Sequence, residues 1–253
     1  MSGRSGTAPT ERKAQLEAQR RAQLEAQRRA QLEAQRRAQL EAQRLVPAYF
    51  GPWQAADWQN VLNERPAIVV LNPANGPGTS PFPEYRTLVS RLRRRGSTVL
   101  MYVHTGYFRR PIGLIEADVR RAIDYFGVDG VFFDEVPVDD ARAVRATIKT
   151  LVGLTPGLPV FNAGRVVPAR WFTTWPDALF VTFEGSLRQF TERFSGDCGT
   201  AVVGPPGRQI WLVHSVPHRS LARVRRSADA HGVGFVYVTA DKLPNPWDVY
   251  ATP

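Results

Sequence analysis

Eight short apolar runs recur along the chain after residue 45, and mostly helical segments separate them. Each run has the length of a strand, and its continuous hydrophobicity is typical of strands that are buried on both faces of a parallel sheet. Strands that alternate regularly with helices over about 200 residues predict a (β/α)8 barrel, the TIM-barrel fold. The predicted strands are residues 46–50, 67–72, 98–104, 131–133, 159–162, 178–184, 209–214 and 234–239.

An open doubly wound sheet is the alternative arrangement of such elements. It loses support because no Gly-x-Gly-x-x-Gly motif follows the first predicted strand, so a dinucleotide site is not expected. The chain also lacks a Gly-x-Ser-x-Gly elbow, a Gly-x-x-x-x-Gly-Lys-Ser/Thr loop and a His-Glu-x-x-His motif. We therefore expect neither a metal nor another cofactor. The single cysteine, Cys198, cannot form a disulfide within the chain and is interpreted as an ordinary loop residue.

Residues 14–45 repeat an eight-residue unit, Ala-Gln-Leu-Glu-Ala-Gln-Arg-Arg, in four copies, the last of which ends in Arg44-Leu45. Every residue type in the unit favours helix, and each glutamate precedes arginine at a helical ion-pair spacing. A coiled coil needs apolar residues every 3.5 positions on average, whereas these leucines recur every eight and rotate around the helix. We expect a long solvated helical extension, with self-association as a coiled coil as the alternative. Residues 1–13 are expected to be disordered, and residues 46–253 to form the barrel.

The formal net charge of +10 is shared equally between the repeat and the rest of the chain, since residues 1–44 hold ten Lys or Arg and five Glu. The barrel region is therefore only mildly basic. No zinc-finger spacing or RNA-binding aromatic signature accompanies the charge, so a specific nucleic-acid partner is not expected. No segment approaches the ~20 apolar residues of a membrane helix, and the N-terminus lacks the apolar core of a signal peptide. As written, the chain is expected to be cytoplasmic.

Polar side chains gather at the carboxyl ends of the predicted strands, which converge on one mouth in a barrel. The most informative stretch is residues 127–137, where an apolar strand ends in Asp134 and Glu135. Two carboxylates there are costly unless they face a wet cleft, although Asp134 as the cap of the next helix is the alternative. Glu184 ends the sixth strand in the same way. The other candidates, which suit sugar hydroxyls and ring faces, are Tyr49, Asn72, Asn75, His104, Tyr107, Asn162, Trp211 and Asp241.

Asp134 and Glu184 lie one strand apart in the predicted barrel. With ~4.8 Å between neighbouring strands their backbones should be about 10 Å apart, and inward side chains shorten that gap to the range that glycoside hydrolases use. The two carboxyl groups are ~5 Å apart in retaining enzymes and farther apart in inverting enzymes, and the sequence is compatible with both. Glu184, beside Phe180 and Phe183, is expected to have a raised pKa and to act as acid/base. Asp134 is the expected nucleophile or charge stabiliser, and Glu135 is expected to support catalysis or bind substrate.

Five motifs follow one another across the globular part of the chain. They are Val-Pro-Ala-Tyr-Phe (residues 46–50), Leu-Asn-Pro-Ala-Asn-Gly-Pro-Gly (71–78), Tyr-Val-His-Thr-Gly-Tyr (102–107), Asp-Gly-Val-Phe-Phe-Asp-Glu (129–135) and Thr-Phe-Glu-Gly (182–185). In combination they resemble spherulation-specific family 4, the spherulin 4-like domain. The resemblance implies a (β/α)8 barrel and an endo-acting hydrolase of galactosamine-containing exopolysaccharide, which cleaves α-1,4-linked N-acetylgalactosamine. It also implies that Asp134, Glu135 and Glu184 are the acids tied to activity.

The leading hypothesis is therefore a glycoside hydrolase that acts on an amino-sugar polysaccharide or oligosaccharide. The alternative is a non-catalytic carbohydrate-binding protein, or a cell-surface or spore-associated structural protein, in which the helical repeat mediates assembly. The resemblance also implies a secreted or surface-held enzyme, whereas no export signal is visible in this sequence. The compartment is left open.

Overall fold

The N-terminal repeat and the barrel form separate compact units in the computed structural model of the chain, Met1–Glu41 and Ala42–Pro253. The structure describes residues 17–29, 31, 44–194, 204–205 and 207–250. Among these residues, none of the helices is both long and apolar enough to cross a membrane.

The larger unit is built on a sheet of parallel strands. Its strands are β1 (Leu45–Ala48), β2 (Ile68–Leu71), β3 (Thr98–His104), β4 (Gly130–Asp134), β5 (Leu158–Asn162), β6 (Leu179–Ser186), β7 (Gln209–His214) and β8 (Phe235–Val238). Each strand from β1 to β7 pairs with the next one in the sequence. A parallel bridge between Arg44 and Val236 brings the two ends of the sheet together. The predicted α/β barrel is therefore confirmed.

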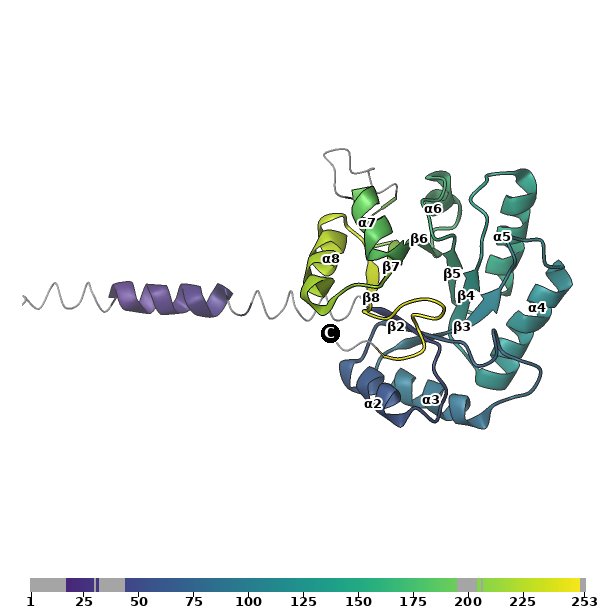
Figure 1. The fold of residues 1–253 in the computed structure, drawn as a ribbon, viewed down its shortest axis with the longest axis horizontal. Helices are drawn as coiled ribbons and strands as arrows, with labels where there is room; N and C mark the ends of the chain where they lie inside the picture. Colours follow the sequence, from purple (N-terminus) through teal and green to yellow (C-terminus); the bar gives the residue numbers. More distant parts are fainter. Residues whose placement is uncertain (1–16, 30, 32–43, 195–203, 206, 251–253) are drawn as a thin grey trace, which may run out of the picture. The chain divides into compact units, whose positions relative to one another are not determined.

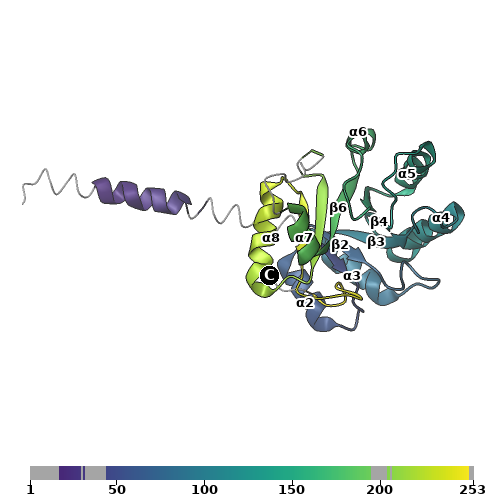
Figure 2. The same ribbon diagram turned by 45° about the horizontal axis from the view of Figure 1, so that its top comes forward.

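The helices lie outside the strands in both views of the ribbon (Figures 1 and 2). They are α2 (Ala55–Glu64), α3 (Pro83–Arg94), α4 (Ile112–Arg121) with the π-helix η1 (Ala122–Phe126), α5 (Arg142–Leu154), α6 (Arg170–Thr174), α7 (Leu187–Phe194) and α8 (His218–Ala230). The shortest α-helices of the barrel are α6, with five residues, and α7, with eight.

The strands are buried on both faces, as their continuous apolar runs predict. In β4, Phe132 packs in the cluster that includes the residues of the barrel interior. Its neighbours Val131 and Phe133 pack in a second cluster with Ile148 and Leu151 of α5. Alternation along the strand thus fills the barrel with one set of side chains and attaches the helices with the other.

The start and the end of the larger unit meet at one buried ion pair. Arg44 pairs with Glu64 of α2, and its guanidinium lies 5.4 Å from the ring centre of Tyr250. The Tyr250 hydroxyl donates a hydrogen bond of 2.7 Å to the same Glu64 carboxylate. Arg44 and Leu45, expected to end the N-terminal helix, therefore belong to the barrel instead, because both find buried partners there.

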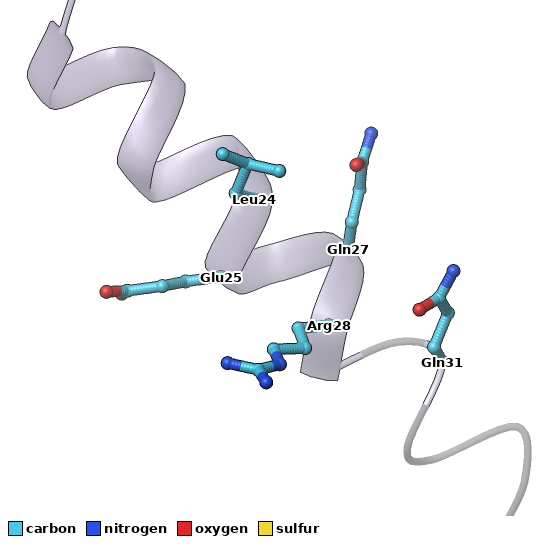
Figure 3. A pocket seen from close by; sticks show the side chains of 5 residues that line it. All are labelled: Leu24, Glu25, Gln27, Arg28 and Gln31. Atoms are coloured by element: carbon cyan, nitrogen blue, oxygen red, sulfur yellow. The ribbon is translucent and has the colours of Figure 1, made fainter.

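The repeat is helical over residues 17–29. The structure does not support one helix through all four copies, since the last copy ends in the barrel, and the expected disorder of residues 1–13 lies outside the described residues. Figure 3 shows the side chains of Leu24, Glu25, Gln27, Arg28 and Gln31, which line a hollow formed by this segment alone. A hollow on one helical segment has no opposing wall, so it makes a poor binding site. Self-association through this segment stays a prediction.

Gly130 is a position in the barrel that has no room for a side chain. A Cβ there would lie 2.1 Å from the carbonyl oxygen of Leu158 on the neighbouring strand. We expect Gly130→Ala to lower the free energy of unfolding by about 1–3 kcal/mol, because β4 and β5 must move apart. Gly113→Ala is the control: a Cβ at this exposed position in α4 meets nothing within 4 Å. That variant should be neutral or slightly stabilising in urea unfolding, and equal losses in both variants would contradict the prediction.

Candidate active site

One pocket of about 340 Å³ opens at the carboxyl ends of the strands. This is the end of a parallel barrel where ligands bind, because all the strand-to-helix loops converge there. The pocket combines carboxylates, amides and aromatic rings, with few purely apolar side chains. Its lining residues are Tyr49, Asn72, Asn75, Tyr102, Asp134, Asn162, Glu184, Leu212, His214, Leu243, Pro244, Asn245, Pro246 and Trp247.

Asn162 joins the two pocket carboxylates. Its Nδ2 donates hydrogen bonds of 2.7 Å to Asp134 Oδ1 and 2.6 Å to Glu184 Oε2. These two carboxylate oxygens are therefore no more than about 5 Å apart, which is compatible with the close carboxyl pair of retaining glycoside hydrolases. The amide oxygen of Asn162 accepts from the backbone N–H of Gly164 at 2.9 Å, which turns the NH2 group towards the acids.

A β-bulge aims Glu184 into the barrel. Side chains alternate along β6, but the register with β7 shifts between Val181 and Phe183. Val181 packs in the cluster of the barrel interior, whereas Phe183 packs with the outer helices. The extra residue, Thr182, reverses the alternation, so Glu184 faces inward and lines the pocket. Without the bulge, Glu184 would face the helices.

Asp134 is held at both carboxylate oxygens. The Tyr102 hydroxyl donates a hydrogen bond of 2.9 Å to Oδ2, opposite the bond from Asn162 to Oδ1. The ring of Tyr49 packs edge-on against Tyr102, with 5.5 Å between ring centres. Burial raises the pKa of Asp134 above its usual range, while the bonds from Tyr102 and Asn162 lower it by stabilising the ionised form. A charged Asp134 thus has two fixed donors.

The pKa of Glu184 lies close to neutral pH. Burial, followed by the charge of Asp134, raises the pKa of Glu184 to about 7, while hydrogen bonds from Asn162 and Trp247 lower it. A carboxyl group with a pKa near neutrality can both give and take a proton at physiological pH. The expected raised pKa is therefore found, and its cause is burial beside a second carboxylate.

Trp247 is a site residue that the sequence analysis missed. It follows β8 in the segment Leu-Pro-Asn-Pro-Trp (residues 243–247), which forms one side of the pocket. Its carbonyl oxygen accepts from the backbone N–H of Tyr49 at 3.1 Å, and its ring lies edge-on to His214 with 6.2 Å between centres. A tryptophan directly after Pro-Asn-Pro is the signal in the sequence, but it lies beyond the end of the last strand.

Glu135 lies beside the pocket and does not line it. Its φ of 56° is left-handed, so the backbone turns sharply after Asp134. The Glu135 carboxylate instead meets His104, with 2.8 Å between Oε2 and Nε2. Its carbonyl oxygen accepts from the Thr105 hydroxyl and from the backbone N–H of Tyr107. These contacts fix the turn that presents Asp134, which suits a positioning residue.

The structure separates the remaining candidates. Tyr49, Asn72 and Asn75 line the pocket together with Asn162. The other three do not, and each has a different partner. Tyr107 is half exposed under the guanidinium of Arg109, Asp241 bonds to Thr239 in its own turn, and Trp211 is only 1% exposed in the outer cluster.

Trp211 is therefore wrong as a substrate-binding residue. Leu212 and His214 face the pocket, and alternation along β7 sends Trp211 to the other face. There it packs against Phe183, Phe190 and Phe194.

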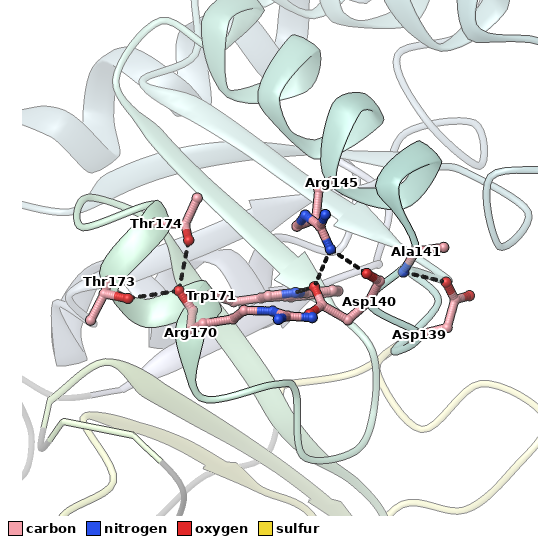
Figure 4. Close-up of polar contacts among 8 residues, drawn as sticks. All are labelled: Asp139, Asp140, Ala141, Arg145, Arg170, Trp171, Thr173 and Thr174. Atoms are coloured by element: carbon pink, nitrogen blue, oxygen red, sulfur yellow. Dashed lines mark hydrogen bonds and ion pairs between the residues drawn. The ribbon is translucent and has the colours of Figure 1, made fainter.

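The loop that follows Asp134 is anchored by contacts that lie outside the pocket. Figure 4 shows the Asp140 carboxylate between Arg145, Arg170 and the indole of Trp171. Trp171 Nε1 donates to Asp140 Oδ1 at 2.9 Å, and Arg170 forms an ion pair with the same side chain. Asp140 thus ties the start of α5 to α6, and the loop after β4 is held at its far end.

Within the part of the chain that the structure describes, no group of three or more His, Cys, Asp and Glu side chains is placed to hold a metal ion. The mutual arrangement of the pocket groups suits acid–base and nucleophilic chemistry on a neutral, hydroxyl-rich ligand. Cys198 lies outside the described residues.

The family model of spherulation-specific family 4 matches residues 43–252. The chain belongs to this family. The spherulation-specific family 4 domain thus includes the whole barrel and the Trp247 segment, but little of the repeat. Spherulin-4 of Physarum polycephalum is 37% identical over 97 residues, a match that spans 36% of this chain and 29% of that relative.

A solved structure shares the fold of this family domain. It is the crystal structure of Aspergillus clavatus Sph3 in complex with GalNAc, which matches with a TM-score of 0.69 and 22% sequence identity. The match covers 83% of this chain and 93% of that one. At that identity the likeness establishes the barrel and its connectivity.

Glu184 should make the folded protein sensitive to pH. Its folded pKa of about 7 exceeds the ordinary value of 4.5, so its ionisation opposes folding increasingly as pH rises between these values. We expect Glu184→Gln to raise the free energy of unfolding by roughly 1–3 kcal/mol at pH 8 and to change it little at pH 4. Chemical denaturation at both pH values checks this. The exposed Glu192→Gln should show no such difference, and an equal gain from Glu184→Gln at both pH values would contradict the assignment.

Proposed function

We propose that this chain is a glycoside hydrolase that cleaves within an amino-sugar polysaccharide, at α-1,4-linked N-acetylgalactosamine or galactosamine. The observation that carries the proposal is the pair of carboxylates, Asp134 and Glu184, whose oxygens one amide holds within about 5 Å of each other. Their environments differ, because Asp134 has two hydrogen-bond donors on its oxygens and Glu184 has a pKa of about 7. Such a difference assigns the two roles of a retaining hydrolase.

In the proposed reaction Asp134 is the nucleophile. Its carboxylate attacks the anomeric carbon and forms a covalent glycosyl ester, while the bond from that carbon to the leaving oxygen breaks. Glu184 gives its proton to the leaving oxygen in the same step. The ionised Glu184 then takes a proton from water, whose oxygen attacks the anomeric carbon and releases Asp134. Asn162 and Tyr102 hold the carboxylates in position throughout.

Two observations support an amino-sugar substrate: the ligand of a structural relative, Sph3, and the side chains of the pocket. Sph3, with the same fold, is seen in complex with GalNAc. The pocket here offers the amides of Asn72 and Asn75 and the rings of Tyr49 and Tyr102, which suit an acetamido group, hydroxyls and an apolar ring face. The N-terminal repeat would be a helical spacer outside the catalytic unit.

Loss of either carboxylate should abolish hydrolysis. We expect Asp134→Asn and Glu184→Gln to lower kcat by at least about 100-fold on defined α-1,4-linked N-acetylgalactosamine oligomers. Mass spectrometry of the products measures this, with Glu192→Gln as the control that keeps wild-type activity. If both pocket variants retain wild-type hydrolysis, the assignment is wrong. Glycan binding by the wild type without release of reducing ends would instead favour a non-catalytic carbohydrate-binding role.

The pH profile tests the role of Glu184. Because the acid must be protonated, kcat/KM should fall above pH of about 7. Trp247→Phe removes a hydrogen bond that lowers the pKa of Glu184, so this alkaline limb should move up by about one pH unit. Trp175→Phe, which changes a buried indole in another cluster, should leave the limb in place. A downward shift in Trp247→Phe would contradict the role given to its indole.

A further inference from the structure

Trp53 is an exposed aromatic side chain in the loop between β1 and α2, close in sequence to the pocket residue Tyr49. Its exposed fraction of 81% is the largest among the exposed large hydrophobic side chains of the described residues. An exposed indole has no role in the hydrophobic core, and its apolar surface costs free energy in water. An aromatic ring beside a sugar-binding cleft suits stacking against the apolar face of a pyranose.

The ring of Trp53 is held in one orientation although it is exposed. A Cβ added at Gly51 would lie 2.2 Å from the Trp53 ring, so one face of the indole rests directly on the backbone of Gly51. That backbone is itself fixed. The Gly51 N–H donates to Gln54 Oε1 at 2.8 Å, and the Gly51 carbonyl accepts from Trp58 Nε1 at 2.9 Å. A ring with one supported face and one open face loses little conformational freedom on binding.

The loop of Trp53 is continuous with the wall of the pocket. The Tyr49 N–H donates to the carbonyl of Trp247 at 3.1 Å, and Gln54 Nε2 donates to the carbonyl of Asp248 at 3.0 Å. Two hydrogen bonds therefore join residues 49–54 to residues 243–248, and both segments contribute residues to the pocket. We call these two joined segments the ridge. Trp53 is four residues from Tyr49, so their Cα atoms are within roughly 14 Å. Leu243, which is 70% exposed and lines the pocket, adds apolar surface to the same ridge.

We propose that Trp53 is a sugar-binding subsite outside the cleavage pocket, which stacks on a ring of a glycan chain that leaves the pocket along this ridge. The inference rests on the proposed function and deepens it. It makes the substrate a polymer or long oligomer, since a ligand that fills only the pocket never reaches Trp53. Recognition requires only the apolar face of a pyranose at this position.

The test compares substrates of two lengths. Trp53→Ala should raise KM for a long α-1,4-linked N-acetylgalactosamine polymer by roughly tenfold, leave kcat unchanged and leave a di- or trisaccharide unaffected. Trp53→Phe should restore part of the polymer affinity because it keeps an aromatic face. Leu114→Ala, which removes an exposed apolar side chain of α4, is the matched control and should change neither substrate.

A second measurement does not depend on catalysis. In an Asp134→Asn background, the polymer should change the tryptophan fluorescence of the chain more than a di- or trisaccharide does, and Trp53→Phe should remove this additional change. If the wild type cleaves the polymer and Trp53→Ala matches it in KM, the subsite is wrong and the proposed function stands. If the wild type binds the polymer through Trp53 but does not cleave it, the proposed function fails and the subsite stands. No binding by the wild type overturns both.

Discussion

One neutral amide determines the geometry of the site. Asn162 donates to Asp134 and to Glu184 at once, which its position at the end of β5, between β4 and β6, makes possible. A cationic side chain at this point would favour the charged form of both acids. The amide instead fixes their separation and leaves the charge of Asp134 free to raise the pKa of Glu184. Two carboxyl groups with the same chemistry thus lie in different surroundings: Asp134 accepts hydrogen bonds at both oxygens, and Glu184 has a pKa of about 7.

The sequence predicted the features that depend on local pattern. Apolar runs placed the strands, and the polar residues that end them placed Asp134, Asn162 and Glu184 at one mouth. Whether Glu184 faces inward depends on a single extra residue in β6, and one residue reverses every side chain of a strand. The sequence does not reveal that bulge, because it arises from pairing with β7. The prediction that Trp211 binds substrate was wrong for a related reason. Leu212 and His214 of the same strand face the pocket, and the alternation of side chains along β7 turns Trp211 towards the helices.

Contacts outside the pocket keep the pocket in shape. Asp140 ties α5 to α6 behind the loop of Asp134, and the contact of Glu135 with His104 fixes the turn directly after it. These contacts join parts of the chain that are distant in sequence, so no local sequence motif predicts them. A site built on strand ends and supported in this way needs little rearrangement when substrate binds, which is the condition for electrostatic stabilisation of a transition state.

The backbone hydrogen bond between Tyr49 and Trp247 joins two parts of the chain that are synthesised at different times. Tyr49 follows the first strand, whereas Trp247 follows the last. A growing chain can align β4, β5 and β6 once β6 has been synthesised, and Asp134, Asn162 and Glu184 are then all present. One wall of the pocket and the indole that donates to Glu184 form only when the segment after β8 folds back onto the start of the barrel. The acids and Asn162 are therefore all synthesised before the segment that completes the wall of their pocket.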